Sequence, residues 1–125
     1  MEQENVFFYD TYAIFEIAKG NPNYDDYTDN VGIAITKLNL MELYYKLLIS
    51  FGIEMAELYY EKYKQFAVDI SDTLIKNAML LRAKHKSKDL SYVDCIGYAF
   101  AIEHKIKFLT GDIQFKDIEN VEFVK

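Results

Sequence analysis

The sequence predicts an α/β fold, a three-layer α/β/α sandwich with a central parallel sheet of four to five strands. Short apolar runs typical of buried strands alternate along the chain with longer segments whose apolar residues recur at helical spacing. This alternation favours a parallel sheet, because parallel strands need crossover connections and helices usually supply them. The chain has 125 residues, 51% of them hydrophobic, so we expect residues 1–125 to form one domain around a single core.

The first part of the chain predicts two strands with a helix between them. Residues 6–9 (Val-Phe-Phe-Tyr) are apolar and continuous, which is typical of a strand buried on both faces. Residues 11–19 follow as a short helix that Gly20 ends. Residues 24–30 are polar and aromatic and fit a loop or a short helix. Residues 32–36 (Gly-Ile-Ala-Ile-Thr) are the second predicted strand.

Two helices and a third strand are predicted next. Residues 37–51 form the longer helix, which ends at Gly52. Its apolar residues at helical spacing are Leu40, Leu43, Tyr44, Leu47, Leu48 and Phe51. Residues 54–64 predict another helix, and its apolar side carries Met55, Leu58, Tyr59 and Tyr63. Residues 66–70 are the third strand.

Two capping signals open the last two predicted helices. Ser71 precedes a helix from Asp72 to about Lys86. Its predicted inward residues are Leu74, Ile75, Ala78 and Leu81. Ser91-x-x-Asp94 opens a helix that runs to about Lys105. The remaining strands are predicted at residues 107–110 and 121–124.

Four carboxylates stand where such a fold could bring them together: Asp10, Glu42, Asp94 and Asp112. Asp10 and Asp112 follow strands, and ligands of parallel sheets bind beyond the carboxyl ends of the strands. Glu42 and Asp94 lie near the starts of helices at the same edge. Carboxylates that share a site repel one another, so we expect them to bind Mg²⁺ or Mn²⁺. Such a site points to hydrolysis of a phosphodiester by metal-activated water.

Each acidic residue also has a purely structural interpretation. Asp10 is placed to cap the helix that follows it, and Asp94 to pair with Ser91 in a reciprocal cap. Glu42 fits a solvated residue in the first turns of its helix, and Asp112 fits a turn residue. The structural interpretations explain the four one at a time, whereas a shared site explains their joint placement.

Composition excludes several classes of protein. The net charge is −6 and the sequence pI is about 4.9, which argues against a protein that coats duplex nucleic acid by charge. Cys95 is the only cysteine, so no intrachain disulfide can form, as suits a reducing cytoplasm. Glu2 and Glu4 stand where a signal peptide would be basic, and no apolar run approaches the roughly 20 residues of a membrane span. We expect a soluble cytoplasmic protein with no membrane partner.

Other catalytic chemistries have weaker support. His85 and His104 lie in charged helix-end stretches and are predicted to be surface residues, which disfavours sites with a histidine base. Zinc sites need His or Cys clusters, which the sequence lacks, and Cys95 fits core packing. A phosphatase of the Asp-x-Asp kind would need an acid at Tyr12, and a receiver-like site would have to rest on Asp69.

Several motifs together resemble the PIN domain, the nuclease fold of many bacterial and archaeal VapC-like toxins. They span nearly the whole chain: Phe8-Tyr9-Asp10-Thr11, Glu42 on the long helix, Ser91-Tyr92-Val93-Asp94-Cys95-Ile96-Gly97-Tyr98-Ala99 with Ala101, and Leu109-Thr110-Gly111-Asp112-x-x-Phe115. The segments around Asp94 and Asp112 are the more specific ones.

The resemblance implies strand order 3-2-1-4-5 and an acidic metal site of the four carboxylates, assisted by Thr110 and Thr11. It also implies cleavage of single-stranded RNA, and in one scenario a homodimeric toxin held inactive by a small antitoxin protein. Two alternatives stay open: a housekeeping RNA-processing nuclease without an antitoxin, and a non-catalytic interaction module that keeps the fold.

Two groups of residues are candidates for holding RNA. The first is the densest basic run: Arg82, Lys84, His85, Lys86 and Lys88. These residues could guide phosphates, although a solvated helix end with lysines near its negative terminus explains them equally well. The second group is three tyrosines near the expected site, Tyr12, Tyr24 and Tyr27, which could stack on unpaired bases.

Overall fold

The computed structural model describes residues 5–125. Its five strands are all parallel and form one sheet in the order β3-β2-β1-β4-β5, which confirms the predicted fold class and strand order. The strands are β1 (Val6–Tyr9), β2 (Gly32–Thr36), β3 (Ala67–Val68), β4 (Lys107–Thr110) and β5 (Val121–Phe123). Glu2 and Glu4, on which the expectation about a signal peptide rests, lie outside the described residues.

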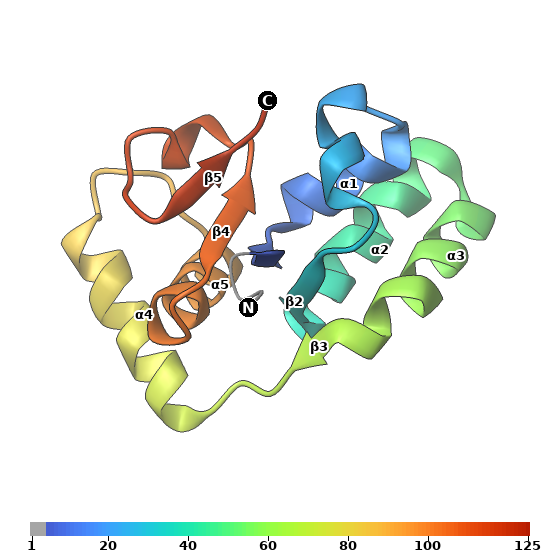
Figure 1. Ribbon diagram of the computed structural model, residues 1–125. Helices are drawn as coiled ribbons and strands as arrows, with labels where there is room; N and C mark the ends of the chain where they lie inside the picture. The colour runs from blue at the N-terminus through green and yellow to red at the C-terminus, as the bar shows by residue number, and fades with distance from the viewer. Residues whose placement is uncertain (1–4) are drawn as a thin grey trace.

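Helices cover both faces of the sheet. Figure 1 shows one helical layer on the right of the sheet and the other on the lower left. The right-hand layer consists of α1 (Thr11–Lys19), α2 (Lys37–Phe51) and α3 (Ile53–Tyr63), and the left-hand layer of α4 (Asp72–Lys84) and α5 (Tyr92–Glu103). Among residues 5–125, no helix combines the length and the apolar character that a membrane crossing requires.

The strands divide the core into two halves. Neighbouring residues of a strand point to opposite faces of the sheet. In the three central strands, one residue packs with α4 and α5 and the next packs with α1, α2 and α3: Phe8 and Tyr9, Ala34 and Ile35, Phe108 and Leu109. All six are buried. These strands therefore read as continuous apolar runs, because both of their faces are covered.

Local signals set the helix ends. Gly20 ends α1 with a left-handed φ of 82°, which glycine adopts without strain. Thr36 opens α2 in a reciprocal capping arrangement with Asn39, and the Ser71 hydroxyl accepts a hydrogen bond from the backbone N–H of Leu74 at the start of α4. The helix starts predicted at these positions are confirmed.

Several boundaries differ from the prediction. Residues 64–66 form a 3-10 turn that continues α3, which limits β3 to two residues instead of the predicted 66–70. The helices α4 and α5 end at Lys84 and Glu103, before the predicted ends. The segment at residues 24–30, predicted as a loop or a short helix, overlaps a 3-10 helix over Pro22–Tyr27.

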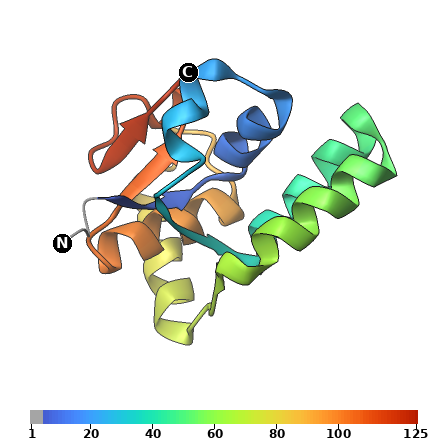
Figure 2. The same ribbon diagram turned by 45° about the vertical axis from the view of Figure 1, so that its right-hand side comes forward.

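The hairpin of α2 and α3 extends beyond the rest of the molecule, as Figure 2 shows. Leu48, Phe51 and Leu58, predicted on the apolar faces of these helices, are 38%, 48% and 59% exposed. The packed face of α3 is formed by Ala56, Tyr59, Tyr60 and Tyr63, and this spacing leaves Leu58 outside it. Ile75 of α4 was predicted to point inward but is 42% exposed. The spacing of Leu74 and Ala78, both buried, sets the inward face of α4 and leaves Ile75 beside it.

Candidate active site

An acidic hollow of about 360 Å³ lies at the carboxyl ends of β1 and β4. Asp10 and Asp112 reach it directly after these strands, Glu42 from α2, and Asp94 from the first turn of α5. The complete lining is Asp10, Thr11, Tyr12, Glu42, Tyr45, Lys46, Ser91, Asp94 and Asp112. The structure thus brings together all four carboxylates that the sequence places at this edge.

Thr110 links Asp10 to Asp112. The Thr110 hydroxyl donates a hydrogen bond of 2.7 Å to Oδ2 of Asp10 and accepts one of 3.0 Å from the backbone N–H of Asp112. Thr110 is fully buried and does not line the hollow. It therefore positions the two acids. Asp10 itself forms no side-chain cap on α1, so its structural interpretation as a helix cap is wrong.

Glu42 is held through a chain of polar side chains. Thr11, at the start of α1, donates a 2.7 Å hydrogen bond from its hydroxyl to Oε1 of Glu42. The same hydroxyl accepts a 3.1 Å hydrogen bond from Nδ2 of Asn39, whose Oδ1 accepts two more from Thr36. Asn39 is 1% exposed. A buried, bonded chain of this kind holds Glu42 in one orientation.

Asp94 caps α5 and also lines the hollow. Its backbone N–H donates to the Ser91 hydroxyl, and its Oδ2 accepts a 3.0 Å hydrogen bond from the backbone N–H of Ser91. This reciprocal cap confirms the structural interpretation of Asp94, but it uses only one carboxylate oxygen. Asp94 also lines the hollow, so the cap orients the side chain there and does not exclude a further role.

The four carboxylates share one hydrogen-bonding pattern. Each has one oxygen that accepts a hydrogen bond: Asp10 from Thr110, Glu42 from Thr11, Asp94 from Ser91 and Asp112 from Gln114. The second oxygen of each has no donor among residues 5–125. Ionised carboxylates are acceptors only. Each side chain is thus oriented by one oxygen and presents the other to a cation, a proton or water.

Negative charge is unfavourable in this hollow, as the pKa values of Asp10 and Asp94 indicate. Asp10 is 3% exposed. Its burial is the main reason that its pKa rises to about 8; the charge of Asp94 raises the pKa as well, while the hydrogen bond from Thr110 opposes the rise. The pKa of Asp94 is also raised, mainly by burial, while its bonds to Ser91 oppose the shift. Both pKa values rise because the charged forms are disfavoured here, and a bound cation would remove much of that penalty.

The donor set fits a hard divalent cation. All of the candidate ligands are carboxylate oxygens, which Mg²⁺ and Mn²⁺ prefer. Among the residues from 5 onward, no three His, Cys, Asp or Glu side chains form a ready-made metal-binding group. Mg²⁺ usually takes only one or two carboxylates and keeps several waters. The hollow therefore fits an ion held by a few direct bonds, with waters bridging to the other acids.

The predicted basic run lies outside this lining. None of Arg82, Lys84, Lys86 and Lys88 borders the hollow. Arg82 contacts the segment before the lining residue Ser91, because its Nε donates a hydrogen bond to the backbone oxygen of Leu90. Its guanidinium lies 4.5 Å from the ring centroid of the exposed Tyr92. Lys84 and Lys88 border a separate hollow with His85.

The three predicted tyrosines differ in their surroundings. Tyr12 lines the acidic hollow and is half-buried. Tyr24 is fully buried and donates from its hydroxyl to the backbone oxygen of Val124, so its predicted stacking on RNA bases is wrong. The hydroxyl of Tyr27 donates to Glu122, and its ring packs edge-on against Phe7. Only Tyr12 of the three therefore faces the hollow.

The residues behind the weaker chemistries lie elsewhere. His104 is exposed, as predicted, and His85 is half-buried; neither lines the acidic hollow. Cys95 is fully buried in the core, which confirms its predicted packing role. Asp69 follows β3 but borders two other hollows. Asp69 therefore does not join the hollow that Asp10, Glu42, Asp94 and Asp112 share.

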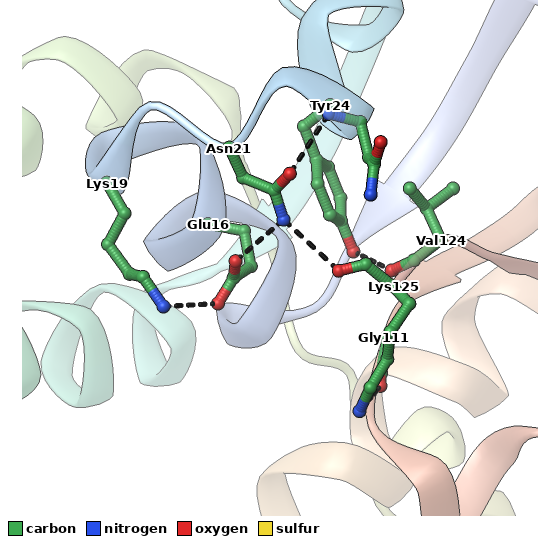
Figure 3. Close-up of polar contacts among 8 residues, drawn as sticks. Glu16, Lys19, Asn21, Tyr24, Gly111, Val124 and Lys125 are labelled. Carbon is green, nitrogen blue, oxygen red and sulfur yellow. Dashed lines mark hydrogen bonds and ion pairs between the residues drawn. The ribbon is translucent and has the colours of Figure 1, made fainter.

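The segment after β5 braces this side of the molecule. Figure 3 shows Asn21 and Tyr24 beside the last residues of the chain: Asn21 donates to the backbone oxygen of Lys125, and Tyr24 to that of Val124. The Lys125 ammonium lies 3.4 Å from the backbone oxygen of Gly111. These contacts connect the turn after α1 to the loop that carries Asp112.

Sequence reasoning missed three residues at this site. Asn39 supports Glu42 through Thr11, and its signal was the Thr36-x-x-Asn39 spacing of a capping box. Tyr45 and Lys46 line the hollow. They stand three and four residues after Glu42, the spacing that places side chains on one helical face.

Comparisons with known proteins agree with this architecture. A comparison with curated protein sequences gives no match. Among solved structures, VapC20 of Mycobacterium tuberculosis, described as a toxin that cleaves the sarcin–ricin loop, superposes with a TM-score of 0.79 at 16% identity, covering 95% of this chain and 99% of that one. VapBC2 of Rickettsia felis, bound to a promoter DNA fragment, gives 0.72 at 22% identity over 96% and 99%. A toxin–antitoxin complex from Klebsiella pneumoniae gives 0.72 at 19% identity over 93% and 95%.

The family match covers the parts of the chain that build the hollow. Residues 7–121 match the PIN domain, a span that includes Asp10, Glu42, Asp94 and Asp112. The sheet order and the structural neighbours agree with that match. The chain therefore belongs to the PIN domain family.

Proposed function

We propose that the protein is a divalent-metal-dependent endoribonuclease that hydrolyses phosphodiester bonds of single-stranded RNA. The observation that carries the proposal is the shared pattern of the four acids: around one hollow, each has one oxygen fixed by a protein donor and a second oxygen with no donor among residues 5–125. Membership of the PIN domain family and likeness to VapC20, described as a toxin that cleaves the sarcin–ricin loop, support the proposal.

The proposed roles follow from these contacts. Asp10, Asp94 and Asp112 act as direct or water-bridged metal ligands through their second oxygens. Glu42 either ligates the metal or orients the attacking water. Thr110 and Thr11 act as positioning residues, because their hydroxyls bond to Asp10 and Glu42. When Mg²⁺ or Mn²⁺ is bound, it neutralises charge on the phosphodiester and activates water for attack.

A small antitoxin protein is the proposed partner. Two of the structural neighbours are toxin–antitoxin assemblies. The projecting hairpin offers exposed apolar side chains for such a partner: Leu48, Ile49, Phe51, Ile53 and Leu58. Exposed large apolar side chains gathered on one hairpin are typical of protein-binding sites. A neighbouring open reading frame for a small DNA-binding protein would favour this toxin role over a housekeeping nuclease.

We further propose a cytoplasmic homodimer. The outer surface of α4 and α5 exposes Leu80 and Ile102, at 70% and 48%, and a small hollow with mostly apolar lining lies between these helices. Apolar surface of this kind suits contact with a second copy of the chain. Arg82, Lys84, Lys86 and Lys88 remain proposed contacts for RNA beyond the hollow.

Cleavage of single-stranded RNA in Mg²⁺ or Mn²⁺ tests the proposed activity. We expect Asp94→Asn to lower kcat/KM by at least about 100-fold, because loss of a ligand charge removes several kcal/mol of transition-state stabilisation. The amide keeps the size of the side chain and an oxygen that can accept the bond from Ser91. Melting temperature should therefore not fall below that of the wild type.

The matched control is Asp29→Asn, which removes the same charge at an exposed position away from the hollow. Its activity should equal that of the wild type. Equal activity in Asp94→Asn and the wild type would remove Asp94 from the mechanism. A wild type that neither cleaves RNA nor binds divalent metal would favour the non-catalytic interaction module.

A further inference from the structure

One face of α2 brings an acid, an aromatic ring and a cation to the same hollow. Glu42, Tyr45 and Lys46 all line it, and their spacing of three and four residues makes them neighbours on the helix surface. Oε1 of Glu42 accepts the hydrogen bond from Thr11, the residue that follows Asp10. Tyr45 and Lys46 stand one helical turn further along α2 and form the edge of the hollow on this side.

Lys46 is the only cationic residue among those that line the hollow. The ion pairs among residues 5–125 are Lys19–Glu16 and Lys64–Glu61, so Lys46 is paired with none of the nearby carboxylates. Its ammonium lies 5.6 Å from the ring centroid of Phe15 on α1. Such a contact with an aromatic face does not neutralise an ammonium group. Lys46 therefore offers an anionic ligand an ammonium group that has no carboxylate partner among residues 5–125.

Tyr45 exposes a large aromatic surface at the same edge. The residue is 65% exposed, and its hydroxyl forms no hydrogen bond with any residue of the described chain. It contrasts with its neighbour Tyr44, whose ring packs against Tyr60 and whose hydroxyl donates to Glu57. No contact within the described fold requires an aromatic ring at position 45. An exposed ring next to a cation is the combination that binds unpaired bases and phosphates of single strands.

We propose that Tyr45 and Lys46 form the substrate-binding edge of this hollow: Lys46 contacts a backbone phosphate next to the cleaved bond, and Tyr45 stacks on an adjacent unpaired base. The inference rests on the proposed ribonuclease function and names how its substrate is held. A lysine contact offsets part of the repulsion between the RNA backbone and the four carboxylates, which an anionic substrate must otherwise overcome. The proposed edge is distinct from the basic run at 82–88.

Binding and kinetics of two substitutions test the edge. Binding is measured as the Kd of a labelled single-stranded RNA in an Asp94→Asn background, and cleavage as kcat and KM in Mn²⁺. Tyr45→Ser should weaken binding at least about fivefold, since stacking contributes about 1–3 kcal/mol per base. Lys46→Gln should raise Kd and KM and reduce the slope of log Kd against log salt by about 0.7, the value for one phosphate contact to a single strand. For both variants kcat should change little.

Conservative and matched variants separate this role from a structural one. Tyr45→Phe keeps the ring and should restore the affinity that Tyr45→Ser loses, and Lys46→Arg should restore the salt slope. Lys76→Gln removes the same charge at an exposed position of α4 that does not line the hollow, and it should leave Kd unchanged. An unchanged Kd in Lys46→Gln and Tyr45→Ser, or an equal rise in Lys76→Gln, would overturn the proposed edge.

The two proposals fail in different ways. If the wild type binds RNA through Tyr45 and Lys46 but cleaves none, the ribonuclease function is wrong, and the edge stands only as a surface that binds single-stranded RNA. If the wild type cleaves RNA and both edge variants keep wild-type KM, the edge is wrong and the ribonuclease function stands. A wild type that binds no single-stranded RNA overturns both.

Discussion

Replacing Asp10 with asparagine should abolish RNA cleavage and at the same time stabilise the metal-free protein at alkaline pH. Asp10 is the most deeply buried of the four acids, and its Oδ2 is fixed by Thr110. Because the amide carries no charge, it cannot neutralise a bound cation, and we expect kcat/KM to fall by at least about 100-fold. An RNA-cleavage assay in Mn²⁺ measures this loss, with Asp29→Asn as the charge-matched control.

The stability effect follows from the direction of the pKa shift. Burial raises the pKa of Asp10 to about 8 in the folded protein, above the value of about 3.9 in an unfolded chain. Between these two values the folded state holds a proton that the unfolded state has released, so stability falls as pH rises. One such group contributes a slope of up to about 1.4 kcal/mol per pH unit. The stability present in acid is lost as pH rises through the folded pKa.

Asparagine removes this titration. We therefore expect the free energy of unfolding of metal-free wild type to fall from pH 5 to pH 8, and that of Asp10→Asn to fall much less. Asp94, whose pKa is also raised, leaves a smaller slope in the variant. Urea unfolding in a chelator at several pH values measures both curves. If the free energies of unfolding of the two proteins fall in parallel as pH rises, the charge of Asp10 is not what destabilises the folded state.

Gly111→Ala should destabilise the fold and disturb the hollow. A Cβ at this position would lie 2.3 Å from the backbone oxygen of Val124 and 2.5 Å from the ring of Tyr12. A backbone oxygen cannot move aside as a flexible side chain can, so we expect a loss of at least about 2 kcal/mol in the free energy of unfolding. Because Asp112 is the next residue and Tyr12 lines the hollow, cleavage should also weaken.

Gly20→Ala provides the comparison for this prediction. Its left-handed φ makes alanine unfavourable, but nothing lies within 4 Å of the added Cβ. Its cost should be about 1 kcal/mol and should leave activity unchanged. Chemical unfolding and cleavage assays on both variants measure the difference. If the two glycine variants lose the same stability and neither loses activity, close packing at Gly111 has no functional importance.

The order of elements and the acidic edge were predictable because they depend on local patterns. Apolar runs mark β1, β2 and β4, and an acid directly after a buried strand must emerge at the carboxyl edge of a parallel sheet. For Asp94, the helix-cap interpretation and the active-site interpretation do not exclude each other. Its reciprocal cap with Ser91 is present and its side chain still lines the hollow, because capping uses only one carboxylate oxygen.

Other features depend on contacts between distant segments. The connection from Asn39 through Thr11 to Glu42 joins α1 to α2, and no spacing within one segment predicts it. Tyr24 lies in a polar stretch of sequence, which is typical of an exposed tyrosine. In the structure it is fully buried, and its hydroxyl donates to the backbone oxygen of Val124 near the end of the chain. The exposure of Leu58 follows from which residues of α3 meet α2 and the sheet: Ala56, Tyr59, Tyr60 and Tyr63 form the packed face, and Leu58 lies outside it.

Binding of Mn²⁺ measured by titration calorimetry tests most directly whether the four acids form a metal site. The account predicts that the wild type binds Mn²⁺ in the millimolar range or tighter, and that its melting temperature rises with Mn²⁺ because the ion binds only the folded state. Asp10→Asn should lose both the binding and the rise, whereas Asp29→Asn should keep them. Equal Mn²⁺ affinity in Asp10→Asn and the wild type, or no binding by the wild type at millimolar Mn²⁺, would contradict the account.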